Sequence, residues 1–131
     1  VAMAGPLSNF IIALISALLI VAVSLIFQAV SPASLTGEHI AEIALEFLKY
    51  SIEINLILAL FNLFPIPPLD GSHVVASLLP PHLGEQYRSL GFMGMFILVA
   101  MMSLGIVGRA LMPVFGYLLN LLNNLIVALV N

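Results

Sequence analysis

The chain has few charged residues and no cysteine. Only 7% of its 131 residues are charged, whereas soluble domains carry about 25%. The net charge of −3 includes no basic run, so the composition does not favour nucleic-acid binding, and we expect no nucleic-acid partner. The absence of cysteine excludes disulfides, thiolate metal sites and cysteine nucleophiles. A bound metal would therefore need His, Asp or Glu ligands.

Apolar runs make up most of the sequence. With 63% hydrophobic residues and a mean hydropathy of +1.24, the chain is expected in a lipid bilayer. The runs predict an all-α, polytopic membrane protein, with residues 1–131 as a single membrane domain. About four transmembrane helices are predicted, at about 7–30, 43–64, 92–110 and 114–130, each near the length that crosses a bilayer core. A short helix is predicted at about 72–79.

Charged residues gather on one face of the second predicted helix. Glu42, Glu46, Lys49 and Glu53 follow one another at spacings of three or four residues, which places them on one helical stripe. The simplest interpretation is a solvated or interfacial stripe. Glu53 lies deepest and, together with Asn55, could instead face a polar cavity.

A proline-rich stretch ends this second helix. Residues 61–75 read FNLFPIPPLDGSHVV and contain three prolines, one carboxylate and one glycine: Pro65, Pro67, Pro68, Asp70 and Gly71. Prolines remove backbone donors and push the preceding residue out of the helical region, so residues 64–69 are predicted to form a non-helical loop. A broken helix and a charge are both costly in a bilayer, which indicates a functional role.

Asp70 is the only aspartate, and the residues alone leave its role open. It could bind a cation, relay a proton or cap the short helix, and the cap is the leading of these interpretations. His73 follows at i+3, but an isolated Asp-x-x-His pair is a weak metal signal. If the first two helices form a hairpin, the Gly5-Pro6 pair lies on the same side as the proline-rich loop.

Two segments carry a resemblance to a known family. AGPLSN at residues 4–9 and NLFPIPPLDG at residues 62–71 together resemble the site-2 protease family of intramembrane zinc metalloproteases, in its compact prokaryotic form. The resemblance covers roughly residues 1–90. It implies a zinc metalloendopeptidase of regulated proteolysis in a prokaryotic cell membrane, with zinc as cofactor and a transmembrane protein as substrate.

The resemblance also implies roles for individual residues. Asp70 matches the third zinc ligand, and Asn62 matches the catalytic residue that steadies the oxyanion or orients the substrate. His73 falls where the family has no ligand. The remaining matched positions form a substrate loop and its support: Pro65, Pro67, Pro68 and Gly71 in the loop, with Gly5, Pro6 and Asn9 supporting the site.

The chain departs from the family in one respect. The H-E-x-x-H motif, which supplies two histidine ligands and the glutamate that activates water, is absent from all 131 residues. In the family this motif lies upstream of the AGP segment, and the chain begins at Val1 rather than at a methionine. We therefore expect a fragment that is inactive alone. The distribution of Lys and Arg residues favours a cytoplasmic position for the loop only slightly.

Two other functions remain open at this stage. A proline-broken helix beside an intramembrane carboxylate is also typical of ion- or proton-coupled transporters. A non-catalytic membrane scaffold would use Asp70 only as a helix cap. The residues that precede the AGP segment in the full-length protein would separate all three interpretations.

Overall fold

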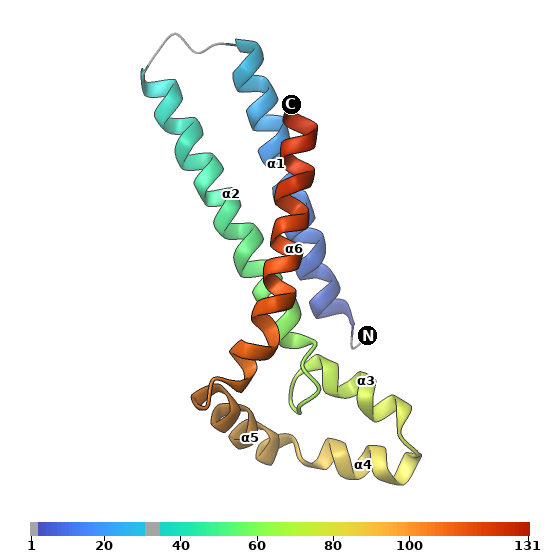
Figure 1. The fold of residues 1–131 in the computed structure, drawn as a ribbon. Helices are drawn as coiled ribbons and strands as arrows, with labels where there is room; N and C mark the ends of the chain where they lie inside the picture. Colours follow the sequence, from blue (N-terminus) through green and yellow to red (C-terminus); the bar gives the residue numbers. More distant parts are fainter. Residues whose placement is uncertain (1–2, 31–34) are drawn as a thin grey trace.

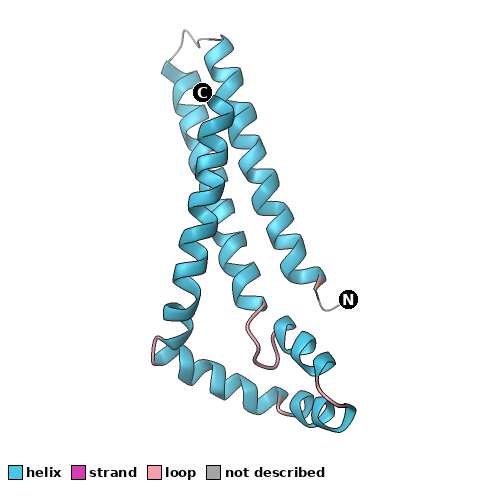
Figure 2. Ribbon diagram, turned by 45° about the vertical axis from the view of Figure 1, so that its right-hand side comes forward, coloured by secondary structure: helices cyan, strands magenta, loops and turns pink. Residues whose placement is uncertain are grey.

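The computed structural model of the chain describes residues 3–30 and 35–131. These residues are helical and contain no strand, which confirms the predicted all-α class. Short loops separate the helices that follow α2 along the chain (Figure 2). The helices are α1 (Ala4–Val30), α2 (Leu35–Asn62), α3 (Asp70–Leu78), α4 (Pro81–Ser89), α5 (Gly91–Ser103) and α6 (Ile106–Val130).

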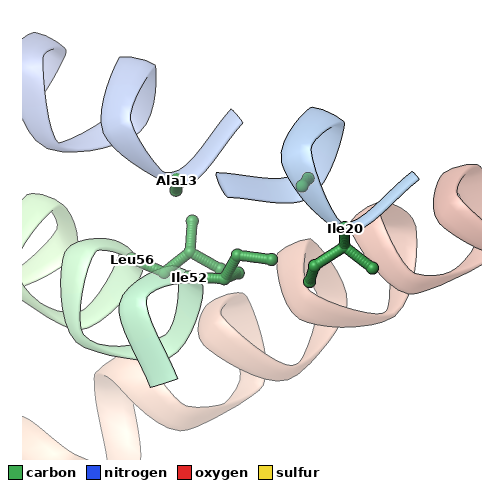
Figure 3. Close-up of a cluster of buried hydrophobic side chains, with 5 residues drawn as sticks. Ala13, Ile20, Ile52 and Leu56 are labelled. Atoms are coloured by element: carbon green, nitrogen blue, oxygen red, sulfur yellow. The ribbon is translucent and has the colours of Figure 1, made fainter. Parts of the chain in front are cut away.

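The three longest helices form a bundle. Helices α1 and α6 run in the same direction and α2 runs against them, while α3, α4 and α5 form an arm at one end (Figure 1). Small residues on α1 let its backbone approach α2 closely. The buried apolar cluster of the bundle, shown in Figure 3, consists of Ala13, Ala17, Ile20, Ile52 and Leu56.

Two hydrogen-bonding contacts and a pocket account for several polar groups of the bundle. The Ser16 and Ser51 hydroxyl oxygens lie 2.9 Å apart across α1 and α2, and the Asn55 amide donates to the Ser51 carbonyl at 2.8 Å. Glu53 is half-buried and, with Lys49, lines a pocket of about 300 Å³ that α6 closes on its other side. Of the two residues considered for a polar cavity, Glu53 therefore borders one, whereas Asn55 bonds to its own helix.

Two of the described helices, α1 and α6, are long and apolar enough to cross a membrane. The prediction of about four spans is not confirmed. Helix α2 has the length, but its apolar half also carries Glu46, Lys49 and Glu53. Helix α5 has 13 residues, about 20 Å of helix, which falls short of a hydrocarbon core of about 30 Å.

The predicted boundary between the third and fourth segments is wrong. The chain turns at Gly105, in the left-handed conformation with φ 68°, and Pro113 lies inside α6. Glycine ends a helix in this way because it has no Cβ to clash. The Arg109 guanidinium donates to the Leu104 carbonyl at 2.8 Å and so satisfies one of the free carbonyls at this turn.

The short helices also differ from their predictions. Helix α3 begins at Asp70 and ends at Leu78, rather than covering 72–79. Residues between the predicted helices form a further helix, α4, which has Pro81 in its first turn. A proline fits there because the N–H group at that position has no partner within the helix. The non-helical loop predicted at 64–69 is confirmed, and it extends over residues 63–69.

Candidate functional site

The two motif segments meet at one end of the bundle. The first turn of α1 and the start of α3 lie at this end (Figure 1). A Cβ atom built on Gly5 would lie 2.5 Å from Oδ2 of Asp70, so the carboxylate rests against the glycine with no room for a side chain. Residues that are 65 positions apart in the sequence therefore share one site, as the hairpin arrangement predicts.

Asp70 does not cap helix α3. It is the first residue of the helix, the cap position belongs to Leu69, and no side chain bonds the free N–H groups there. The Ser72 hydroxyl instead donates back to the Leu69 carbonyl at 2.7 Å. Among the described residues, no hydrogen bond or ion pair involves the Asp70 carboxylate. The half-buried carboxylate thus keeps its oxygens for another ligand.

The proline loop, residues 63–69, is a set of tight turns rather than a straight strand. Each of its N–H groups donates within the chain, and prolines supply none. The N–H group of Leu63 donates to the Ala59 carbonyl, that of Phe64 to Phe61, that of Ile66 to Phe64 and that of Leu69 to Ile66, with N···O distances of 2.9–3.1 Å. The loop consequently offers carbonyl acceptors, and no free N–H donors, to any molecule beside it.

Gly71 packs the start of α3 against the end of α2. A Cβ atom on Gly71 would collide with the backbone carbonyls of Leu63 and Phe64. Gly71 is buried, and its neighbours are backbone atoms that cannot rotate away. Only glycine fits this contact without moving one of the two helices. The sequence analysis placed Gly71 in the loop without anticipating this packing.

Helices α4 and α5 contact the loop at two points that the sequence analysis did not find. The Tyr87 hydroxyl of α4 donates to the Pro65 carbonyl at 2.6 Å. Gly94 of α5 lies directly against the Pro67 carbonyl, with no space for a side chain. A glycine in an apolar helix was the one signal available, and nothing in it identifies the partner.

The other predicted site residues lie around this end. Asn62 is the last residue of α2 and is half-buried, as is Asn9, whereas Pro6 is fully buried. Neither Asn62 nor Asn9 makes a side-chain hydrogen bond to the described part of the chain. Pro65 and Pro68 are exposed and Pro67 is buried. The structure brings Gly5 and Asp70 into contact, and it leaves the two amides without protein partners.

The described residues can supply only part of a metal site. No group of three His, Cys, Asp or Glu side chains comes together within residues 3–30 and 35–131. His73 and His82 are exposed, and His39 approaches Glu42 at 3.5 Å. Zinc sites in proteins use three or four protein ligands. Asp70 therefore fits as one oxygen ligand of a site whose other ligands would come from outside these residues.

Comparisons with known proteins match the chain to a family of peptidases. The family model described as "Peptidase family M50" matches residues 1–104. The chain is 36% identical over 103 residues to the "Putative zinc metalloprotease YwhC" of Bacillus subtilis (strain 168), and the match covers 74% of this chain and 44% of the relative. No solved structure matches the chain. The chain thus spans less than half of this curated relative, and the family match ends where α5 ends.

Proposed function

The chain belongs to peptidase family M50, and we propose that it is part of an intramembrane zinc metalloprotease that hydrolyses peptide bonds of membrane-embedded substrates. The observation that carries the proposal is the contact between Asp70 and Gly5. This contact brings the AGPLSN and NLFPIPPLDG segments together at one end of the bundle. The carboxylate makes no hydrogen bond or ion pair with the described residues. A capping aspartate would need neither the glycine nor the second segment.

Asp70 would be one of the zinc ligands. Zinc, when bound, lowers the pKa of its water to about 7 and polarises the scissile carbonyl. Gly5 leaves room for an oxygen of this carboxylate beside the first turn of α1. Holding a ligand in one position is what gives a metal centre its geometry.

Asn62 would bind the substrate backbone. Its amide stands at the end of α2, immediately before the loop that leads to Asp70. The loop donates all its N–H groups internally and so offers no donor to a substrate carbonyl or oxyanion. The Asn62 amide has such a donor. Loop carbonyls can accept N–H groups from an unwound substrate segment.

The remaining parts of the machinery would come from elsewhere in the full-length protein. The 131 residues contain no H-E-x-x-H motif, which would supply two histidine ligands and a glutamate base. The chain alone is therefore proposed to be inactive. The enzyme would lie in a prokaryotic cell membrane with a transmembrane protein as its substrate, and with the proline loop on the cytoplasmic side.

The test compares two variants of the full-length protein. Asp70→Ala is expected to abolish cleavage of a membrane substrate and to lower the zinc content measured by elemental analysis, because the metal loses a ligand. Asn62→Ala is expected to reduce turnover while the zinc content stays normal. His73→Ala, three residues from Asp70 and exposed, is the matched control and should retain both. Full activity of Asp70→Ala would exclude the proposed role.

A further inference from the structure

The proline loop has fewer N–H groups than carbonyls. Pro65, Pro67 and Pro68 have no N–H groups, and the N–H groups of the other four loop residues are already donated within the chain. None of these N–H groups donates to the carbonyls of Pro65 or Pro67. The Pro65 carbonyl accepts the Tyr87 hydroxyl from α4, 22 residues later in the chain, at 2.6 Å.

Tyr87 is well suited to remain a donor. Its side chain is half-buried, and burial raises the pKa of the phenol above its ordinary value. The hydroxyl therefore stays protonated throughout the neutral range and can donate to a carbonyl. A carbonyl oxygen cannot donate, so the bond has only one possible direction.

A second contact fixes the next turn of the same loop. Pro67 is buried, and its carbonyl touches the backbone of α5 at Gly94, where a side chain would collide. Helices α4 and α5 thus each hold one proline of the loop. The loop connects Asn62 to Asp70, so its shape decides how these two side chains are placed relative to each other.

We propose that Tyr87 is a positioning residue, which holds the proline loop in the shape that sets Asn62 and Asp70 for substrate turnover. The inference rests on the proposed protease function, because the placement matters for cleavage. Tyr87 itself is not assigned any contact with metal or substrate. It acts through the Pro65 carbonyl alone.

The test uses Tyr87→Phe in the full-length protein, with Tyr117→Phe as the matched control because Tyr117 lies exposed on α6. Amide hydrogen exchange of residues 63–69 is measured by mass spectrometry, together with zinc content, kcat and KM. Loss of one hydrogen bond is expected to make exchange in the loop about fivefold faster. We expect kcat to fall about fivefold, with zinc content and KM unchanged and Tyr117→Phe like the wild type.

Other outcomes would overturn the inference. Unchanged loop exchange and kcat would mean that the Tyr87 bond does not hold the loop, while the protease function would stand. Faster exchange throughout α3, α4 and α5, with a parallel loss of zinc, would indicate a general structural role. If the wild-type protein cleaves no membrane substrate, the protease function fails, and the exchange measurement alone then decides whether Tyr87 holds the loop.

A second variant tests the contact between α5 and the loop. Gly94→Ala places a methyl group on the Pro67 carbonyl, so the loop must shift, whereas Gly91→Ala in the same helix meets nothing within 4 Å. We expect Gly94→Ala to reproduce the faster loop exchange and lower kcat of Tyr87→Phe. If Gly94→Ala leaves the loop exchange unchanged, the arm does not control the loop and the inference is wrong.

Discussion

The three-helix bundle and the site end of the molecule are held together by different kinds of contact. In the bundle, flexible apolar side chains such as Ile20, Ile52 and Leu56 interlock. At the site end, glycines bring backbone or a carboxylate into direct contact: Gly5 with Asp70, Gly71 with Leu63, and Gly94 with Pro67. A side chain can rotate when a neighbouring residue is replaced by a larger one, but a backbone carbonyl cannot. The bundle should therefore tolerate small changes better than the site end does.

The two regions are also expected to contribute differently to stability and to catalysis. Without a hydrophobic driving force in lipid, the bundle depends on packing and on hydrogen bonds such as the Ser16–Ser51 pair. The site end contains the residues proposed for metal and substrate, in positions that backbone contacts determine. Substitutions in the bundle are then expected to change the free energy of unfolding, and substitutions at the site end to change cleavage.

Gly71→Ala should have the largest effect of the glycine substitutions. The new methyl group would meet the Leu63 and Phe64 carbonyls, so α3 must move away from the end of α2 and carry Asp70 with it. We expect the free energy of unfolding to fall by about 1–3 kcal/mol. Cleavage should fall by roughly a hundredfold, because a displacement of about 1 Å is enough for such a loss.

The control for Gly71→Ala is Gly108→Ala, which adds the same methyl group in α6 where nothing lies within 4 Å. It should be neutral in cleavage and unfolding assays in detergent micelles. Wild-type cleavage by Gly71→Ala would show that the backbone contact is not needed, and the contrast between the two regions would lose its main support.

Gly5→Ala should act on the site with little effect on stability. Its methyl group would meet only the end of the Asp70 side chain, which can rotate away, so the free energy of unfolding should change by less than about 1 kcal/mol. The carboxylate would then leave its position, and we expect zinc affinity and cleavage to fall roughly 10- to 100-fold. Titration of the full-length protein with zinc, compared with Gly116→Ala as control, measures the effect. Unaltered zinc affinity would contradict the role of Gly5.

Local sequence signals predicted the parts of the fold that depend on local chemistry. The prolines located the loop, because a missing N–H ends a helix wherever it occurs. Counting two helices as a hairpin placed the Gly5-Pro6 pair on the same side as the proline loop. The predicted break before 114, next to Pro113, was wrong because a proline can be accommodated within an apolar helix. Gly105 in a left-handed turn ends α5 instead.

Contacts between distant elements could not be predicted. The Tyr87 bond to Pro65 and the approach of Gly94 to Pro67 depend on how α4 and α5 fold back towards the loop, and no local pattern encodes this path. Tyr87 lies outside every helix and motif that the sequence predicted, so its hydroxyl carried no signal. The sequence motifs therefore propose the site residues, but they give no sign of the residues on α4 and α5 that contact the loop.

Ser16→Ala should have the smallest effect and should be confined to the bundle. The substitution removes one of the two hydroxyls that pair across α1 and α2, while Ser51 still accepts the Asn55 amide on its carbonyl. Hydrogen bonds between membrane helices contribute about 0.6 kcal/mol on average, so we expect a loss of about 0.5–1 kcal/mol in unfolding experiments and unchanged cleavage. Ser103→Ala, which removes an exposed hydroxyl bonded within α5, is the control. If Ser16→Ala lowered cleavage as much as Gly5→Ala does, the bundle would be part of the catalytic geometry, and the separation of the two regions would be wrong.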